Sequence, residues 1–253
     1  MESRESKFTF FRQSGWVALA TMLGGAFMVA VHKPASKMPE AEYGVFLALL
    51  QVFNLMSIPA IGLQTVFARQ TAAALDSDSR QKLVGTTRAV IKTIFVLWLV
   101  MLLVVAFFQQ SILHTLQITH PAALWITVMI GLLSMWSPVN MGLLQGQQNF
   151  LWYGGISILG GVCRLAAVFV FVYLLQGESS SAMIAVLAGV SIPLAAAFWQ
   201  NRFCWTEPSQ PIVWKDWLEQ VIPLTMGAGA ASFMMSADMV FVQKYFDKSE
   251  TAY

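Results

Sequence analysis

Charged side chains are scarce in this sequence, and their scarcity excludes most soluble folds. Only 11% of the 253 residues are Asp, Glu, Lys or Arg, whereas an ordinary soluble domain has about 25%. Residues 93–163 contain no charged side chain at all, although about 20 apolar residues are enough to cross a bilayer. Such a run cannot form a water-facing surface. The chain is therefore predicted to be an integral membrane protein.

Cysteine, histidine and basic clusters are also few. The two cysteines, Cys163 and Cys204, do not suggest a disulfide framework or a metal site. His114 and His120 are interpreted as loop residues, because a metal site needs more ligands than this loop offers. The net charge is only +2 and no basic run occurs, so nucleic acid is not an expected partner. No cofactor or metal is expected.

Apolar residues are abundant, at 57% of the chain. Backbone groups in hydrocarbon must be hydrogen-bonded inside the structure, so membrane spans are helices or strands of closed barrels. These runs do not alternate with a period of two, which favours helices. The fold class is therefore all-α, a polytopic membrane helix bundle. Spans are expected near residues 14–31, 43–66, 89–109, 121–144, 151–175, 182–200 and 218–243.

The distribution of basic residues predicts the orientation in the membrane. With the N-terminus in the cytoplasm, four basic residues would lie outside: Lys33, Lys37, Lys244 and Lys248. Ten would lie inside: Arg4, Lys7, Arg12, Arg69, Arg80, Lys82, Arg88, Lys92, Arg202 and Lys215. Cytoplasmic segments of membrane proteins carry the excess of Lys and Arg. A cytoplasmic N-terminus is therefore predicted.

Three segments resemble a known family. The segment YGVFLALLQVFNLMSIPAIGLQTVFARQTA (43–72) looks like the second helix of bacterial polysaccharide exporters and lipid-linked oligosaccharide flippases. The segment GLLQGQQNFLWYGGISILGGVCRLA (142–166) is similar to their turn between helices four and five, and SADMVFVQKYFDKSETAY (236–253) to helix seven and the loop after it. The superfamily also contains multidrug extruders.

The resemblance implies a fold, a function and a location. Family members have two lobes of six helices, so residues 1–200 would form the first lobe, 201–217 a cytoplasmic linker, and 218–253 the first helix and outer loop of an incomplete second lobe. The expected function is export of a lipid-linked oligosaccharide or polysaccharide precursor by alternating access in a bacterial inner membrane, without enzymatic activity. The expected partners are a polyprenyl-diphosphate-linked glycan and the bilayer. The chain would be a fragment or a truncated product, needing its missing lobe or self-association to enclose a cavity.

Arg164 is the strongest candidate for a substrate-binding residue. It lies near the middle of the fifth predicted span, where a charge costs at least roughly 2.5 to 3.5 kcal/mol, and so it should not face lipid. One interpretation is that its guanidinium binds the diphosphate of the lipid-linked sugar, because its geometry suits phosphate oxygens. The other is structural: an ion pair with Asp238, or hydrogen bonds to the carbonyls of a kinked helix.

Two further charged residues lie in or near predicted spans. Asp238 is the acidic residue well inside the seventh span, where it either takes up a proton and couples transport to an ion or serves as a static partner or a residue of an aqueous mouth. Arg69, at the inner end of the second span, resembles a basic residue of the family. We interpret Arg69 as a cytoplasmic anchor that reaches anionic headgroups.

Helix-breaking and polar residues inside the spans favour a transporter. Prolines within spans remove backbone donors and kink helices, and glycines allow close packing. Gly24 and Gly25 are expected to face Gly227 and Gly229 at the lobe interface. Amides and hydroxyls either line a hydrophilic cavity or hydrogen-bond between helices: Asn54, Ser57, Gln64, Ser134, Ser137, Asn140 and Gln145. The prolines that fall inside predicted spans are Pro59, Pro138, Pro193 and Pro223.

Other functions remain as alternatives. A multidrug extruder of the same superfamily is expected to carry acidic residues in the spans of its first lobe, and the first six spans here contain none. A membrane-embedded glycosyltransferase or ligase of envelope assembly usually needs a large loop with clustered acids, His or Arg. The longest loops, near 69–88 and 201–217, lack paired carboxylates suited to metal binding.

Overall fold

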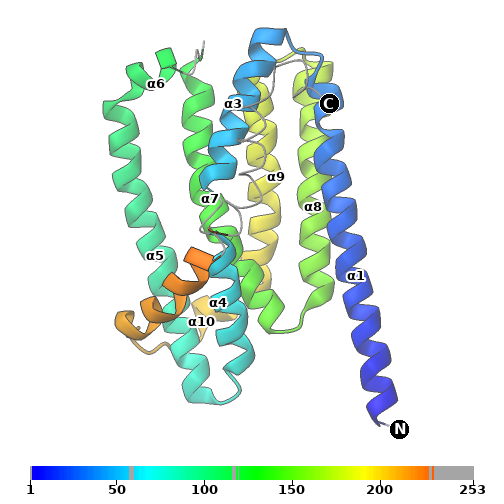
Figure 1. Cartoon of the computed structure of the whole chain (residues 1–253), viewed down its shortest axis with the longest axis vertical. Helices are drawn as coiled ribbons and strands as arrows, with labels where there is room; N and C mark the ends of the chain where they lie inside the picture. Colours follow the sequence, from blue (N-terminus) through cyan, green and yellow to red (C-terminus); the bar gives the residue numbers. More distant parts are fainter. Residues whose placement is uncertain (1, 57–59, 116–117, 119, 228–229, 231–253) are drawn as a thin grey trace.

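The computed structural model describes residues 2–56, 60–115, 118, 120–227 and 230. In this part of the chain there are helices and no strands, which confirms an all-α membrane helix bundle. Figure 1 shows the long helices running side by side along the longest axis. The N-terminus, α4 and α10 lie at one end and α6 lies at the other.

The helices follow the predicted order, with short helices added at the ends. Five long apolar helices of the described residues are candidate membrane spans: Gly15–Ala35, Ser77–Phe107, Pro121–Gly146, Phe150–Leu174 and Ser179–Gln200. The elements are α1 (Glu2–Ala30), α2 (His32–Ala35), α3 (Glu40–Met56), α4 (Ala60–Ala73), α5 (Ser77–Phe107), α6 (Gln109–Thr115), α7 (Pro121–Gly146), α8 (Phe150–Val168), the π-helix η1 (Phe169–Leu174), α9 (Ser179–Gln200) and α10 (Phe203–Thr206). A further helix occupies 214–227.

Two predicted spans are only partly described. The second, 43–66, corresponds to α3 and the first half of α4, and residues 57–59 between them lie outside the described residues. The seventh, 218–243, begins earlier than predicted, because the described helix starts at residue 214. Most of that span lies outside the described residues.

The start of α5 corrects the prediction of a basic loop before residue 89. The helix begins at Ser77, and the carboxylate of Asp76 caps it by accepting hydrogen bonds from the backbone N–H of Asp78 and Ser79, at 3.1 and 3.0 Å. Lys82 and Asp78 lie one helical turn apart, and the ion pair between Lys82 Nζ and the Asp78 carboxylate stabilises the first turns of α5. Hydropathy detects only the apolar part of this helix, so its polar beginning resembled a loop.

Two large apolar clusters of buried residues form most of the core, and a small third one contains Leu144, Ile156 and Ala197. One contains Val31, Phe46 and Met183 and joins α3, α7, η1 and α9 near the end that carries α2. The other contains Phe67, Leu143 and Trp217 and joins α4, α5 and α7 to the helix 214–227. Helix 214–227 therefore packs on the described bundle through its own apolar face.

Helices α1 and α8 approach closely at glycines. A Cβ added to Gly24 would lie 3.0 Å from the carbonyl oxygen of Ser157, and one added to Gly161 would lie 2.9 Å from the carbonyl oxygen of Gly24. Small residues allow this contact between backbones in membrane helices. The expected partner of Gly24 was Gly227, which has no atom within 4 Å of an added Cβ. Gly229 lies outside the described residues.

The segment after α9 is bound to the polar beginning of α5. The Arg80 guanidinium donates two hydrogen bonds to the carboxylate of Glu207, at 2.6 and 2.7 Å. Arg88 donates to the carbonyl oxygens of Cys204 and Glu207, at 2.6 and 2.7 Å. The backbone N–H of Gln210 donates to the carbonyl oxygen of Gln81 at 3.1 Å. We call this contact between 203–210 and 78–88 the linker clamp.

Burial inside the linker clamp keeps Cys204 a neutral thiol. The side chain is buried against α5, and burial raises the pKa of the Cys204 thiol to about 12. A thiol with so high a pKa is a poor nucleophile at neutral pH. Cys204 thus serves as a packing residue of the apolar core.

Gly85 is predicted to be indispensable for the linker clamp. A Cβ at this position would lie 1.7 Å from the carbonyl oxygen of Gln210, so Gly85→Ala should displace the linker and lower the melting temperature in detergent, at a cost of about 1–3 kcal/mol. The matched control is Gly155→Ala in α8, where an added Cβ meets nothing within 4 Å. This control should raise the melting temperature, because Ala favours a helix over Gly by about 1 kcal/mol. Equal shifts would contradict the predicted close contact.

The ion pair of Arg80 and Glu207 is predicted to make stability depend on pH in acid. Hydrogen bonding from Arg80 holds the pKa of Glu207 below its ordinary value of 4.5. The carboxylate therefore stabilises the fold above pH 4.5, and its contribution is lost as the pH falls through the lowered pKa. Glu207→Gln should melt below the original protein at pH 7, and this difference should shrink as the pH falls below 4.5 and Glu207 takes up a proton. A difference that persists in acid would show that the charge of Glu207 is not the cause.

Candidate functional site

Arg164 lies in the interior of the bundle, near the middle of the span formed by α8 and η1. Only 7% of the residue is exposed. Its neighbour on α9 is Gly189, where an added Cβ would lie 2.6 Å from the Cβ of Arg164. Because Gly189 has no side chain, there is room for Arg164 between α8 and α9.

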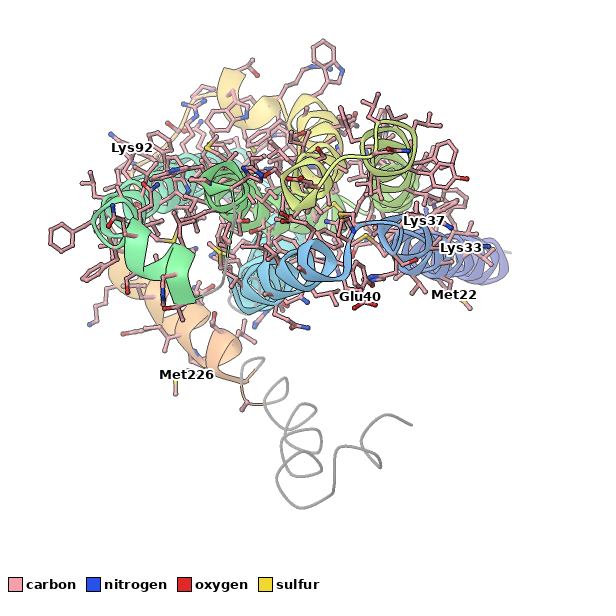
Figure 2. The ribbon with its side chains drawn as sticks, turned by 90° about the horizontal axis from the view of Figure 1, so that it is seen from above. Met22, Lys33, Lys37, Glu40, Lys92 and Met226 are labelled. Carbon is pink, nitrogen blue, oxygen red and sulfur yellow. The ribbon has the colours of Figure 1, made fainter. Side chains whose placement is uncertain are left out.

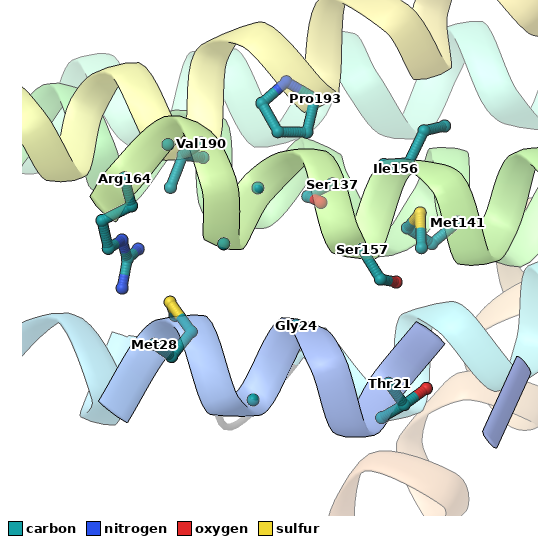
Figure 3. A pocket seen from close by; sticks show the side chains of 14 residues that line it. Thr21, Gly24, Met28, Ser137, Met141, Ile156, Ser157, Arg164, Val190 and Pro193 are labelled. Carbon is teal, nitrogen blue, oxygen red and sulfur yellow. The ribbon is translucent and has the colours of Figure 1, made fainter. Parts of the chain in front are cut away.

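The guanidinium of Arg164 has few partners. Its Nε is buried and has no hydrogen-bond acceptor among the described residues. Its Cζ lies 5.8 Å from the centroid of the Phe53 ring on α3, a distance that allows a cation–π interaction. Figure 3 shows the side chain leaving α8 towards α1, beside Met28. Asp238, one of the predicted partners, lies outside the described residues.

A cavity of about 400 Å³ lies beside Arg164, between α1, α7, α8 and α9. Its polar side chains are Arg164 and the hydroxyl residues Thr21, Ser137 and Ser157. No carboxylate is found among the described residues that line it. The rest of the lining is glycine and apolar side chains, which include Met28 and Pro193. The cavity is thus positive and can offer hydroxyl groups to a ligand.

Pro193 adds a free acceptor to the wall of this cavity. It lies inside α9 and has no backbone N–H, so the carbonyl of Gly189, four residues earlier, loses its usual helical donor. That carbonyl oxygen faces α8, where an added Cβ at Gly160 would lie 3.3 Å away. Pro138 lies inside α7 in the same way. Pro59 lies outside the described residues.

The predicted amides mostly hydrogen-bond between helices. The Gln64 side-chain amide donates to Gln145 Oε1 and to the Tyr153 hydroxyl, both at 3.1 Å. The Asn201 side-chain amide donates to the carbonyl oxygen of Asn140 at 3.0 Å. Of the two interpretations, interhelical bonding therefore holds for Gln64, Asn140 and Gln145. Ser137 lines the cavity, Ser134 bonds within its own helix, Asn54 is exposed, and Ser57 lies outside the described residues.

The remaining candidates lie away from Arg164. Arg69 is exposed on α4, at the end of the bundle that also carries α10 (Figure 1). His120 Nε2 lies 2.9 Å from a Glu178 carboxylate oxygen, which joins the starts of α7 and α9. In the part of the chain that the structure describes, no group of three His, Cys, Asp or Glu residues could hold a metal.

The sequence identified Arg164 but not its surroundings. The contacts with Phe53 and Gly189 join three helices that are distant in sequence, and no periodicity relates them. Gly24, Thr21 and Met28 line the cavity from α1, a helix whose glycines were expected to face another partner. Only a three-dimensional arrangement could reveal these neighbours.

No protein-family model and no curated protein sequence matches this chain. Several solved structures share its fold. A MATE crystallised in complex with Br-NRF has a TM-score of 0.69 and 15% identity, over 88% of this chain and 55% of that one. A MOP superfamily transporter from Pyrococcus furiosus has a TM-score of 0.66 and 15% identity, over 92% and 55%. An outward-facing multidrug resistance MATE family transporter of the MOP superfamily has a TM-score of 0.69 and 14% identity, over 92% and 55%.

These similarities establish the architecture of the chain. The chain spans about half the length of the transporters it resembles. The identities of 14 to 15% show a common fold and do not determine a substrate. This multi-pass membrane protein therefore has the fold of one part, about half, of a MATE-type transporter of the MOP superfamily.

Proposed function

We propose that this chain is part of a membrane exporter that moves a lipid-linked oligosaccharide across a bacterial inner membrane by alternating access. The observation that carries the proposal is Arg164, a residue that is 7% exposed and whose buried Nε has no acceptor in the described part of the chain. It lies beside a cavity of about 400 Å³. A diphosphate joining a polyprenol to its glycan would supply the missing acceptor.

The chemistry of the cavity supports an anionic group with sugar attached. An arginine fork can donate two parallel hydrogen bonds to phosphate oxygens, and such charge-assisted bonds are among the strongest in proteins. Thr21, Ser137 and Ser157 bring hydroxyl groups to the same cavity, where they can hydrogen-bond to sugar hydroxyls. The buried cation would thus be compensated when the substrate is bound.

The charge of the cavity ranks the alternatives. A multidrug extruder of the same superfamily would take cationic substrates more readily through a carboxylate, and none is found among the described residues of this cavity. One neighbour in fold, from Pyrococcus furiosus, is itself described as having a binding pocket of reverse polarity that suggests a different function. A glycosyltransferase or ligase is the third alternative, and detecting sugar transfer by the purified protein would favour it.

The proposal includes the division of the chain and the roles of the other charged residues. Residues 1–200 would form a six-helix lobe, 201–217 a cytoplasmic linker and 218–253 the beginning of a second lobe. The N-terminus would be cytoplasmic, Arg69 would anchor the inner side, and Asp238 would couple transport to an ion. A second lobe, or a second copy of the chain, would complete the cavity.

Arg164 provides the decisive test of the function. In the full-length protein, Arg164→Ala or Arg164→Glu should reduce glycan export at least tenfold, because the diphosphate loses its cationic partner, while membrane insertion stays intact. Arg164→Lys should retain part of the export, since lysine keeps the positive charge but cannot donate the two parallel hydrogen bonds of a guanidinium. Export would be measured as surface glycan in cells that depend on the protein.

A matched control removes a positive charge outside the cavity. Lys33 is exposed at the end of the bundle opposite α10, and Lys33→Ala should leave export unchanged. Normal export by Arg164→Ala at normal membrane levels would refute the proposed role of the arginine.

A further inference from the structure

Five aromatic rings form a continuous row across α5, α7, α9 and α10. Trp98 and Phe95 lie with their ring centroids 5.9 Å apart, Phe95 and Trp136 6.3 Å, Trp136 and Phe198 6.0 Å, and Phe198 and Trp205 5.9 Å. We call this row the aromatic ladder. It lies on the side of the bundle that is formed by α5, α9 and α10.

Hydrogen bonds fix two rings of the aromatic ladder from within. The indole N–H of Trp98 donates to the carbonyl oxygen of Val128 at 2.9 Å, and that of Trp136 donates to the carbonyl oxygen of Ile91 at 3.2 Å. Two of the five rings are exposed, Phe95 by 39% and Trp205 by 44%. Trp98, Trp136 and Phe198 are half-buried, so the ladder is anchored in the bundle and exposes apolar surface at Phe95 and Trp205.

Two cations border the aromatic ladder and have no carboxylate partner among the described residues. Lys92 is exposed and lies one helical turn before Phe95 on α5, and Figure 2 shows it at the edge of the bundle, on the side away from Met226 and Glu40. Arg202 is also exposed, and its Cζ lies 5.6 Å from the ring centroid of Trp199, which is 68% exposed. Arg80, near by, is already neutralised by Glu207.

We propose that the aromatic ladder with Lys92 and Arg202 binds anionic phospholipid. The acyl chains lie along the rings, and Lys92 and Arg202 pair with the negative headgroups. Tryptophan rings alone favour any lipid–water interface. Lys92 and Arg202, which have no carboxylate partner among the described residues, add selectivity for negatively charged lipid. Each raises the affinity for an anionic membrane surface roughly fivefold.

Brominated lipids provide the test, because bromine on an acyl chain quenches nearby tryptophan fluorescence. The full chain is placed in nanodiscs of phosphatidylcholine in which one tenth of the lipid is either brominated phosphatidylglycerol or brominated phosphatidylcholine. We expect at least twofold more quenching with the phosphatidylglycerol. High salt should reduce this excess, since it screens exposed charges. Trp205→Phe should also reduce it, because one reporter of the ladder is removed.

The double variant Lys92→Ala, Arg202→Ala should bring the quenching down to the level of phosphatidylcholine. The matched control is Lys33→Ala, Lys37→Ala, which removes two exposed cations on the other side of the bundle from Lys92 (Figure 2) and should keep the excess. Helix content measured by circular dichroism establishes that each variant is folded. Equal quenching by both lipids in the original protein, or an excess that survives in the folded double variant, would overturn the proposal. If a protein or a second lobe covered the aromatic ladder, the two lipids would quench equally in the original protein.

Discussion

A positive charge held within apolar helices is the constraint around which this structure is arranged. Moving an arginine to the middle of a span costs several kcal/mol unless it meets a partner, water or substrate. Arg164 has a ring face on α3 and an open cavity beside it, and its Nε has no acceptor among the described residues. Under the proposed function, a negatively charged ligand would offset this cost whenever it is bound.

The glycines of α8 and α9 make this arrangement possible. Gly189 leaves space for the Arg164 side chain, and Gly161 lets α1 approach α8 closely. Helix α8 thus packs closely against both α1 and α9. Pro193 leaves a carbonyl free in the same wall. Close packing, a free acceptor and a cavity thus occur together within two turns of Arg164.

Most of the fold could be predicted from the sequence, because hydrophobic length alone determines where a chain crosses a membrane. The prediction was wrong where polar helix continues beyond the apolar span, as in residues 77–88, since hydropathy does not detect a capped, charged helix. Arg164 could be identified because it interrupts an uncharged region. Its cavity could not, because Phe53, Gly189 and Met28 come together only through the packing of separate helices. For Gln64 and Asn140 the same pattern of amides fitted two interpretations, and only their partners decided between them.

The linker clamp determines how mechanical load passes along the chain. Gln210 is hydrogen-bonded to α5, and only residues 211–213 separate it from the helix 214–227. A force that pulls on helix 214–227 therefore acts on α5 first, through the linker clamp. It acts on α9 only afterwards, although α9 is closer to that helix in sequence. The connection 211–213 has only three residues, and its length limits how far the two sides can separate.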